Sequence, residues 1–185
     1  MFIRDTEISL RAATALVNSL PEIDDDRIDR LATLEDLAAF LREHPYSGVI
    51  RRDDVELSEL RAARSRLRML WTGDRVSAVP IVNAMLRESK ALPQLVIHDG
   101  YDWHIHATDD AAPLATRITV EVAMAFVDVI RSDEFDRVRV CSADDCEAVY
   151  IDYSKNGSKR YCDTGNCGNR MNVNAYRRRK AEESA

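Results

Sequence analysis

Residues 141–167 read CSADDCEAVYIDYSKNGSKRYCDTGNC and contain all four cysteines of the 185-residue chain, in the pattern C-x4-C-x15-C-x4-C. Two close cysteine pairs separated by a loop of this length are typical of a four-thiolate zinc site. The alternatives are two disulfides or four unrelated thiols. We expect a reducing compartment, which argues against disulfides, because the opening residues MFIRDTEISLRAA are too charged for an export signal. The sequence therefore predicts one structural Zn²⁺ held by Cys141, Cys146, Cys162 and Cys167, with no coordination position left for water.

The segment between the two cysteine pairs predicts a hairpin. Ala148–Asp152 favours a strand, Lys155–Ser158 contains the Asn-Gly pair of a tight turn, and Lys159–Tyr161 favours a returning strand. From about Asn169 to Glu182 the chain lacks proline and predicts a helix. Zinc would join the start of this helix to the hairpin and contribute folding free energy on the order of 10 kcal/mol.

Composition and charge narrow the protein class. With 45% hydrophobic and 31% charged residues, the chain can build a core, which excludes a wholly disordered protein. No apolar run reaches the roughly 18 residues of a membrane span, so we expect a cytoplasmic protein without membrane contact. The net charge of −6 is uneven: residues 154–180 hold eight basic residues and one acidic residue, a net +7, which leaves −13 on the rest. The basic segment is therefore a candidate for binding a polyanion.

Apolar periodicity predicts a mainly helical body before the cysteines. We expect helices at Leu10–Leu20, at Leu34–Leu41 and at Leu57–Trp71; a Thr33/Asp36 capping box precedes the second, and Gly73 ends the third. A fourth helix is expected to begin at a Ser77 cap, with Pro80 in its first turn. A fifth is expected at Thr116–Ile130, although Ile118, Val120 and Val122 also alternate as in a strand. Pro93–Ile97 and Trp103–Ala107 predict two strands joined at residues 98–101 by an Asp-Gly turn. The class is α+β, with a mainly helical domain with a β-hairpin over residues 1–135 and a small treble-clef or ribbon-like zinc finger of hairpin plus helix over residues 136–185.

The cysteine-containing segment resembles a known family, the CGNR zinc finger. The resemblance rests on Cys167-Gly168-Asn169-Arg170, the three preceding cysteines, Tyr150-Ile151-Asp152-Tyr153-Ser154, the basic pair Lys159-Arg160 and the following Tyr-Arg-Arg-Arg, over about residues 138–180. Tyr161 stands where the family more often has Trp, and Met171 where it often has a small or basic residue. Proteins of this family usually carry an N-terminal ABATE domain, to which Leu16-Val17-Asn18-Ser19 and Thr33–Leu41 are similar. The resemblance implies a DNA-binding finger on a regulatory domain.

Candidate functional residues in the helical body are few. His104 and His106 share one strand face, and we interpret them as hydrogen-bonded or solvent-facing strand residues rather than as metal ligands or a general base. Asn18 lies beside an apolar helix face, where a buried amide needs hydrogen-bond partners; a ligand contact is the alternative. The chain has no phosphate loop, nucleophile elbow or zinc-protease motif, and we expect no enzymatic activity.

The basic segment divides into two sets of candidate nucleic-acid contacts. On a helix, Arg170, Asn174, Arg177 and Arg178 lie near one face, and such side chains match guanine and adenine edges in the major groove. Lys155, Lys159, Arg160, Arg179 and Lys180 are suited to phosphates. Val173 and Tyr176 are expected to pack on the hairpin. Arg170 could instead support the zinc loop or bind Asp152, and the Arg177–Lys180 tail could be a solvated helix end.

Two functions remain open from the sequence. The first is a transcription regulator that binds duplex DNA through the finger, with an N-terminal domain that senses a small ligand or forms a homodimer reading two half-sites. The second is a protein-interaction or RNA-associated zinc module, whose basic helix docks on an acidic surface such as this protein's own body.

Overall fold

The computed structural model describes residues 2–23, 26–97 and 103–183 of an α+β protein. Its helices are α1 (Arg4–Asn18), α2 (Leu34–Glu43), α3 (Asp54–Thr72), α4 (Arg75–Glu88), α5 (Leu114–Arg131) and α6 (Cys167–Glu182), with a short 3-10 turn, η1, at Phe135–Arg137. Its strands are β1 (Gln94–Val96), β2 (His104–His106), β3 (Val138–Val140) and β4 (Val149–Ile151). β1 and β2 form the antiparallel pair predicted for residues 93–107, while the turn predicted at residues 98–101 lies outside the described residues.

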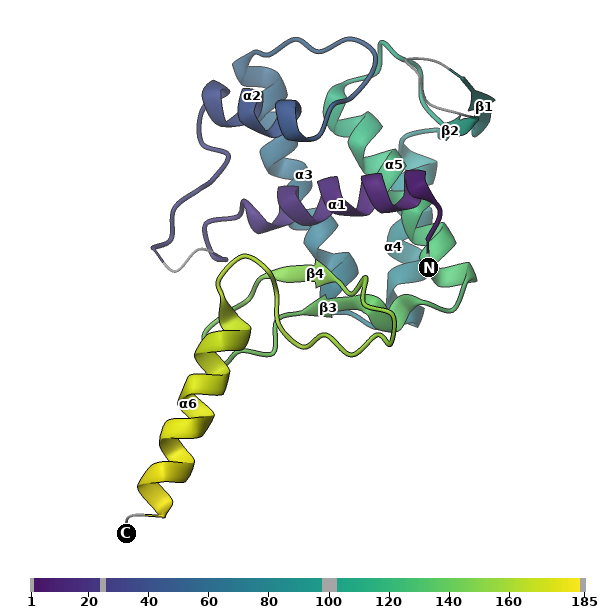
Figure 1. The fold of residues 1–185 in the computed structure, drawn as a ribbon. Coiled ribbons are helices and arrows are strands. Elements are labelled where there is room, and N and C mark those ends of the chain that lie inside the picture. The colour runs from purple at the N-terminus through teal and green to yellow at the C-terminus, as the bar shows by residue number, and fades with distance from the viewer. Residues whose placement is uncertain (1, 24–25, 98–102, 184–185) are drawn as a thin grey trace.

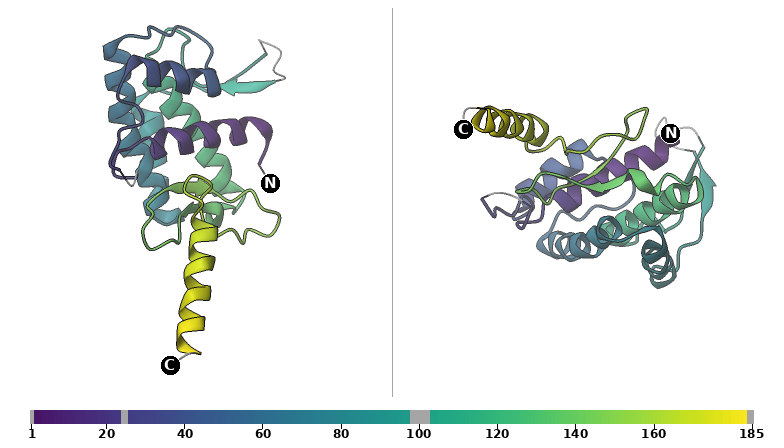
Figure 2. Two further views of the ribbon diagram at one scale, coloured as in Figure 1. Left: turned by 60° about the vertical axis from the view of Figure 1, so that its left-hand side comes forward. Right: turned by 90° about the horizontal axis from the view of Figure 1, so that it is seen from below.

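Helix α5 lies at the centre of the core. Its Ile118, Val122 and Phe126 are fully shielded from solvent and recur every four residues, as helical packing requires. α1, α3 and α4 pack around α5, as Figures 1 and 2 show. The helix predicted at residues 116–130 is confirmed. Its strand-like alternation has a simple cause, because a helix covered on several sides is apolar on several faces.

The helix caps confirm one prediction and correct another. The Thr33 hydroxyl accepts from the Asp36 backbone N–H and the Asp36 carboxylate accepts from the Thr33 N–H, which is the predicted capping box. Ser77, however, does not cap α4: Asp74 does, and its carboxylate accepts from the Ser77 N–H at 2.8 Å. Pro80 therefore lies in the second turn of α4 rather than in the first. Gly73 ends α3 as predicted, but in an extended conformation rather than a left-handed one.

The hairpin of the C-terminal segment differs from the prediction in its pairing. β4 forms as expected, but it pairs with β3, with Val138 opposite Ile151 and Val140 opposite Val149. The prediction of a returning strand at Lys159–Tyr161 is wrong, because the backbone groups of this segment form hydrogen bonds with side chains and with one loop N–H instead of with a strand. The Lys159 N–H donates to the Asp152 carboxylate, the Lys159 carbonyl accepts from the Tyr150 hydroxyl, and the Arg160 carbonyl accepts from the Ser142 N–H.

The β3–β4 hairpin is joined to the helical body at the free edge of β4. The Val149 N–H donates to the Asn18 side-chain oxygen at 2.8 Å, and the Asn18 amide donates to the Val149 carbonyl at 2.9 Å. The Trp71 indole N–H donates to the neighbouring Tyr150 carbonyl at 3.1 Å. Val138, Val149 and Ile151 also pack in the same apolar core as the helices. Asn18 on α1 thus takes the place of a third strand.

Helix α6 projects away from the rest of the molecule, as Figures 1 and 2 show. It confirms the helix predicted at residues 169–182 and begins two residues earlier, at Cys167. Val173 and Tyr176 are 47% and 59% exposed, so the prediction that they pack on the hairpin is wrong. The helix axis leads away from β3 and β4, which leaves only the start of α6 in contact with the cysteine loops.

Candidate metal centre and basic helix

The four cysteines converge on one small site, although they come from three different segments. Cys141 and Cys146 lie in the loop between β3 and β4, Cys162 lies in the loop after β4, and Cys167 is the first residue of α6. Their four Sγ atoms all lie within 4.8 Å of one another, and all four thiols are free rather than disulfide-bonded. Among the residues that the structure describes, this is the only group of three or more His, Cys, Asp or Glu donors close enough to hold one metal ion.

The sulfur geometry fits zinc. A tetrahedral ion with Zn–S bonds of about 2.3 Å places its sulfur ligands about 3.8 Å apart. The Cys162 Sγ atom lies 3.8 Å from that of Cys146 and 3.7 Å from that of Cys167. Four thiolates satisfy the tetrahedral preference of zinc and leave no position for water, so the ion that this site holds is structural. When bound, zinc supplies the positive charge that lets four thiolates lie together.

Polar groups around the sulfurs are arranged to support thiolates. The Thr164 hydroxyl donates to Cys162 Sγ at 3.1 Å, and the Cys162 N–H donates to Cys141 Sγ at 3.4 Å. Burial raises the pKa of the Cys146 and Cys167 thiols. Burial acts in the same direction on Cys162, but the Thr164 hydroxyl and the backbone N–H groups of Thr164 and Gly165 outweigh it and lower the Cys162 pKa to about 7.

Two residues let the chain approach the last cysteine closely. Asn166 adopts a left-handed conformation with φ of 51°, a conformation that asparagine tolerates better than most residues. A Cβ atom at Gly165 would lie 3.1 Å from Cys167 Sγ, closer than a side chain ordinarily comes to sulfur. The tight turn therefore brings Cys167 to the metal site at the point where α6 begins, and metal binding fixes that end of the helix.

Arg170 is committed to the cysteine loops. Its guanidinium binds the Asp145 carboxylate through two hydrogen bonds of 2.9 and 3.0 Å, and it also donates to Cys167 Sγ at 3.3 Å. The structural role considered for Arg170 is therefore present, but Asp145 replaces the expected Asp152 as its partner. Asp145 was missed in the sequence, where the acidic pair Asp144-Asp145 between two cysteines was the available signal.

Asp152 organises the loop that follows β4. It is fully buried, and its carboxylate accepts from the backbone N–H groups of Ser154 at 2.8 Å and Lys159 at 2.7 Å. Burial opposes its ionisation, but these hydrogen bonds and the nearby Arg139 guanidinium lower its pKa. Arg139, a second residue that sequence reasoning missed, donates to the carbonyls of Gly157 and Lys159. The basic loop is thus held in place by Asp152, directly after β4, and by Arg139 on β3.

The remaining predicted nucleic-acid contacts lie on exposed surface. Lys155, Arg160, Asn174, Arg177, Arg178, Arg179 and Lys180 are all exposed. No ion pair with another described residue holds Arg177, Arg178 or Arg179. Lys159 differs, because its ammonium group binds Asp163 at 2.5 Å and lies above the Tyr150 ring. The structure therefore brings the arginines together on the projecting helix and engages Lys159 and Arg170 within the finger.

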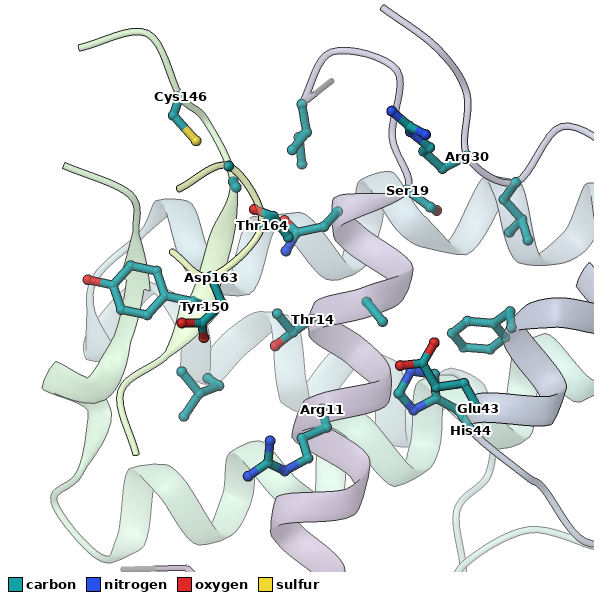
Figure 3. A pocket seen from close by; sticks show the side chains of 18 of the residues that line it. Arg11, Thr14, Ser19, Arg30, Glu43, His44, Cys146, Tyr150, Asp163 and Thr164 are labelled. Carbon is teal, nitrogen blue, oxygen red and sulfur yellow. The ribbon is translucent and has the colours of Figure 1, made fainter. Parts of the chain in front are cut away.

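A groove of about 990 Å³ separates the finger from the N-terminal helices. Figure 3 shows Arg11 and Thr14 of α1 between two sets of side chains, with Asp163 and Thr164 of the finger on one side and His44, at the end of α2, on the other. Cys146 and Cys167 also line this groove. One face of the metal centre therefore borders a groove that α1 also lines.

Comparisons with known protein families agree with this architecture. The model of the CGNR zinc finger matches residues 137–180, which include all four cysteines and most of α6. The model of ABATE, described as "Putative stress-induced transcription regulator", matches residues 10–133, two thirds of the chain. No curated protein matches the sequence. None of the helices in the described ranges is long and apolar enough to cross a membrane. Because the ABATE model covers the helical body and the cysteine site has the finger's geometry, the chain belongs to the family of ABATE-domain proteins with a C-terminal CGNR zinc finger.

Proposed function

We propose that this protein is a non-enzymatic, zinc-dependent transcription regulator that binds duplex DNA through α6. The observation that carries the proposal is the projecting helix itself. One end of α6 is fixed by the metal site and by the Arg170–Asp145 pair, while Arg177, Arg178 and Arg179 lie exposed near the other end. An arginine-rich helix held out in this way is the form in which many DNA-binding modules enter the major groove.

The dimensions and side chains of α6 suit the major groove. Sixteen helical residues extend roughly 24 Å, and the groove, about 12 Å wide, admits one helix. Asn174, Arg177 and Arg178 lie three and four residues apart and therefore share a face. Arginine pairs with guanine and asparagine with adenine through two hydrogen bonds each, so this face is assigned to base edges.

The other basic residues of the finger are assigned to phosphates. Lys155 and Arg160 lie in the exposed loop between β4 and α6, and Arg179 and Lys180 lie at the end of α6. Lys159 and Arg170 contribute positive charge but are engaged with Asp163 and Asp145. The net +7 on residues 154–180 attracts DNA, whereas the −13 elsewhere repels it. This charge division orients the protein with the finger toward the duplex.

The N-terminal domain is proposed to sense a small molecule or to form a homodimer. A single finger buries too little surface for high specificity, so we infer that two copies read two half-sites. The four-thiolate centre has no open coordination position, which supports a structural rather than a catalytic metal.

A second candidate function is docking on an acidic protein surface. The observation that favours it is the exposure of Val173 and Tyr176, an apolar pair on a basic helix. Such a pair would be covered by a partner protein but is not required for phosphate contact. In this structure α6 points away from the acidic body, so the partner in this alternative is another molecule (Figure 1).

The test compares a double variant of α6 with a matched variant of the body. Arg177→Ala/Arg178→Ala and Arg42→Ala/Arg87→Ala each remove two exposed positive charges. Zinc-loaded proteins are first used to select sheared genomic DNA in the presence of excess tRNA, and affinity for recovered DNA is then measured by fluorescence anisotropy at several salt concentrations. We expect loci sharing a motif, at least tenfold weaker binding by the α6 variant, and unchanged binding by the body variant.

The salt dependence separates the two candidate functions. Each phosphate contact contributes about −0.9 to the slope of log K against log salt, so DNA binding by several contacts is steeply salt-dependent. Recovery of no shared motif, or equal DNA affinity in both double variants at unchanged zinc content, would refute α6 as the DNA-reading element. Binding of a protein partner with a shallow dependence on salt, and without competition by DNA, would support protein docking instead.

A further inference from the structure

A second pocket, separate from the metal centre, lies between α1, α5, the segment after α2 and strand β2. Its volume is about 280 Å³, close to the lower end of small-molecule sites, about 300–1,000 Å³. Its walls combine apolar side chains with three carboxylates, and no lysine or arginine among the described residues lines it. The carboxylates belong to Asp5, Glu121 and Asp128, and the apolar residues include Ile8, Ile105 and Met124.

Glu121 has no direct counterion in the part of the chain that the structure describes. Among the described residues, no hydrogen bond or ion pair engages its carboxylate. Arg117 lies one helical turn earlier on α5, and its guanidinium donates to the carbonyls of Ser47, Val49 and Ala112 rather than to Glu121. Its positive charge favours the ionised form of Glu121, but burial has the larger effect and keeps the Glu121 pKa raised. Asp128, by contrast, accepts from the Thr6 hydroxyl at 2.7 Å. A carboxylate that is largely removed from water and left unpaired is costly, so a bound cation would stabilise it.

Tyr46 supplies a second unsatisfied group beside Glu121. Its hydroxyl oxygen is shielded from solvent and has no hydrogen-bond partner within the described ranges. Burial, and then the nearby Glu121 charge, raise the Tyr46 pKa well above its usual value, so the ring carries no charge of its own at neutral pH. The ring also lines the pocket together with those of His104 and His106. Aromatic rings attract organic cations through their faces, which adds to the pull of the carboxylates.

We propose that this pocket binds a small organic cation, a primary ammonium group on an apolar body, with Glu121 as its counterion. The apolar walls take the body of the ligand, and the ammonium group faces the carboxylates. If the N-terminal domain senses a small molecule, as proposed above, this pocket is the binding site and an organic ammonium is the class of ligand. Its occupancy does not depend on DNA binding, so either proposal can fail while the other stands.

The chemistry of the pocket favours an organic cation over a metal ion. The Nε2 atoms of His104 and His106 lie 3.1 Å apart, but no described third donor is close enough to complete a metal site with them. Hard cations also prefer sites built wholly from oxygen ligands and water, whereas this pocket presents isoleucine and methionine side chains. Apolar walls around a carboxylate match an ammonium group with hydrocarbon attached.

The test uses three probes of similar size, of which one is positively charged, one neutral and one negatively charged. Isothermal titration calorimetry on the zinc-loaded full chain at pH 8 compares phenethylammonium with 2-phenylethanol and with phenylacetate. We expect the ammonium to bind at least tenfold more tightly than the alcohol and the carboxylate not to bind. Equal affinity for ammonium and alcohol, preference for the carboxylate, or no ammonium binding would each overturn the proposal, and this comparison needs no variant.

Four variants locate the site. Glu121→Gln should weaken phenethylammonium binding at least tenfold, whereas Glu35→Gln, the same change at an exposed position on α2, should leave it unchanged. Met124→Trp fills the pocket and should weaken binding of the ammonium and the alcohol together. Circular dichroism checks that each variant is folded. Unchanged ammonium affinity in folded Glu121→Gln, or a second equivalent of Zn²⁺ that His106→Ala removes, would refute the assignment.

Discussion

Replacing Asn18 with alanine should weaken the attachment of the β3–β4 hairpin to the helical body. The Asn18 side chain makes two hydrogen bonds with the backbone of Val149, at 2.8 and 2.9 Å, and Val149 is fully buried. Asn18→Ala leaves one N–H and one carbonyl without partners, and each such group costs about 1–3 kcal/mol when it stays buried. Water can reach part of the space beside α1, so we expect a loss of about 3 kcal/mol.

This loss is large enough to measure by thermal unfolding. For a chain of this length, each kcal/mol lowers the Tm by about 2–4 °C, so Asn18→Ala should lower it by about 6–12 °C. Circular dichroism of the zinc-loaded protein measures the Tm, and hydrogen exchange measures protection of the Val149 amide. Asn174→Ala, on the exposed face of α6, serves as the control and should change the Tm by less than about 2 °C. A Tm for Asn18→Ala equal to that of the control, with Val149 still protected, would refute the third-strand role of Asn18.

Other outcomes follow from the metal site and from Glu121. Cys162→Ser, or chelation of the metal, should abolish stoichiometric zinc binding and reduce helicity at α6; full zinc content in the variant would contradict the four-thiolate site. Asp145→Ala breaks an exposed ion pair with Arg170 and should lower the free energy of unfolding by less than about 1 kcal/mol. Urea unfolding measures this loss, and zinc analysis should still find one equivalent; a larger loss or less zinc would contradict the prediction. Burial raises the Glu121 pKa from 4.5 to about 7, so its contribution to stability is complete below about pH 4.5 and is lost as the pH rises to about 7. As the pH rises from 4.5 to 7, the free energy of unfolding of Glu121→Gln should therefore increase by up to about 3 kcal/mol relative to that of the wild type. Parallel pH profiles of unfolding for the two proteins would count against a buried, ionising Glu121.

Local patterns in the sequence predicted much of this protein. The cysteine spacing indicated a zinc site because tetrahedral coordination needs two close pairs and a connecting loop, and the structure places all four sulfurs together. The capping box at Thr33 and Asp36 forms because its two hydrogen bonds join residues only three apart. The helix at α6 was also predictable, since no proline or glycine interrupts it after Gly168.

Competition between neighbouring groups explains the local errors. Both Asp74 and Ser77 are good caps; Asp74 takes the extended conformation of an N-cap, and Ser77 lies inside the first turn and donates its N–H to the Asp74 carboxylate. Lys159–Tyr161 has strand-like residues, but Asp152 and Tyr150 reach its backbone before any strand can pair with it. Each error concerns which of two nearby partners a backbone group takes, and a sequence pattern does not rank such partners.

The sequence by itself determined the six α-helices in the described part of the chain, the four zinc ligands and the separation of an acidic body from a basic helix, because these depend on composition and on spacing along the chain. Only the tertiary structure decided that β4 pairs with β3, that Asn18 completes its other edge and that Arg170 binds Asp145. It also decided that Val173 and Tyr176 remain exposed and that Glu121 faces a partly apolar pocket without a hydrogen-bond or ion-pair partner among the described residues. The pairs that bond lie 9 to 13 residues apart in the β3–β4 hairpin, 25 apart for Arg170 and Asp145, and 131 apart for Asn18 and Val149. The longest of these distances is set by the packing of α1, α3 and β4 in one core, which no local preference encodes.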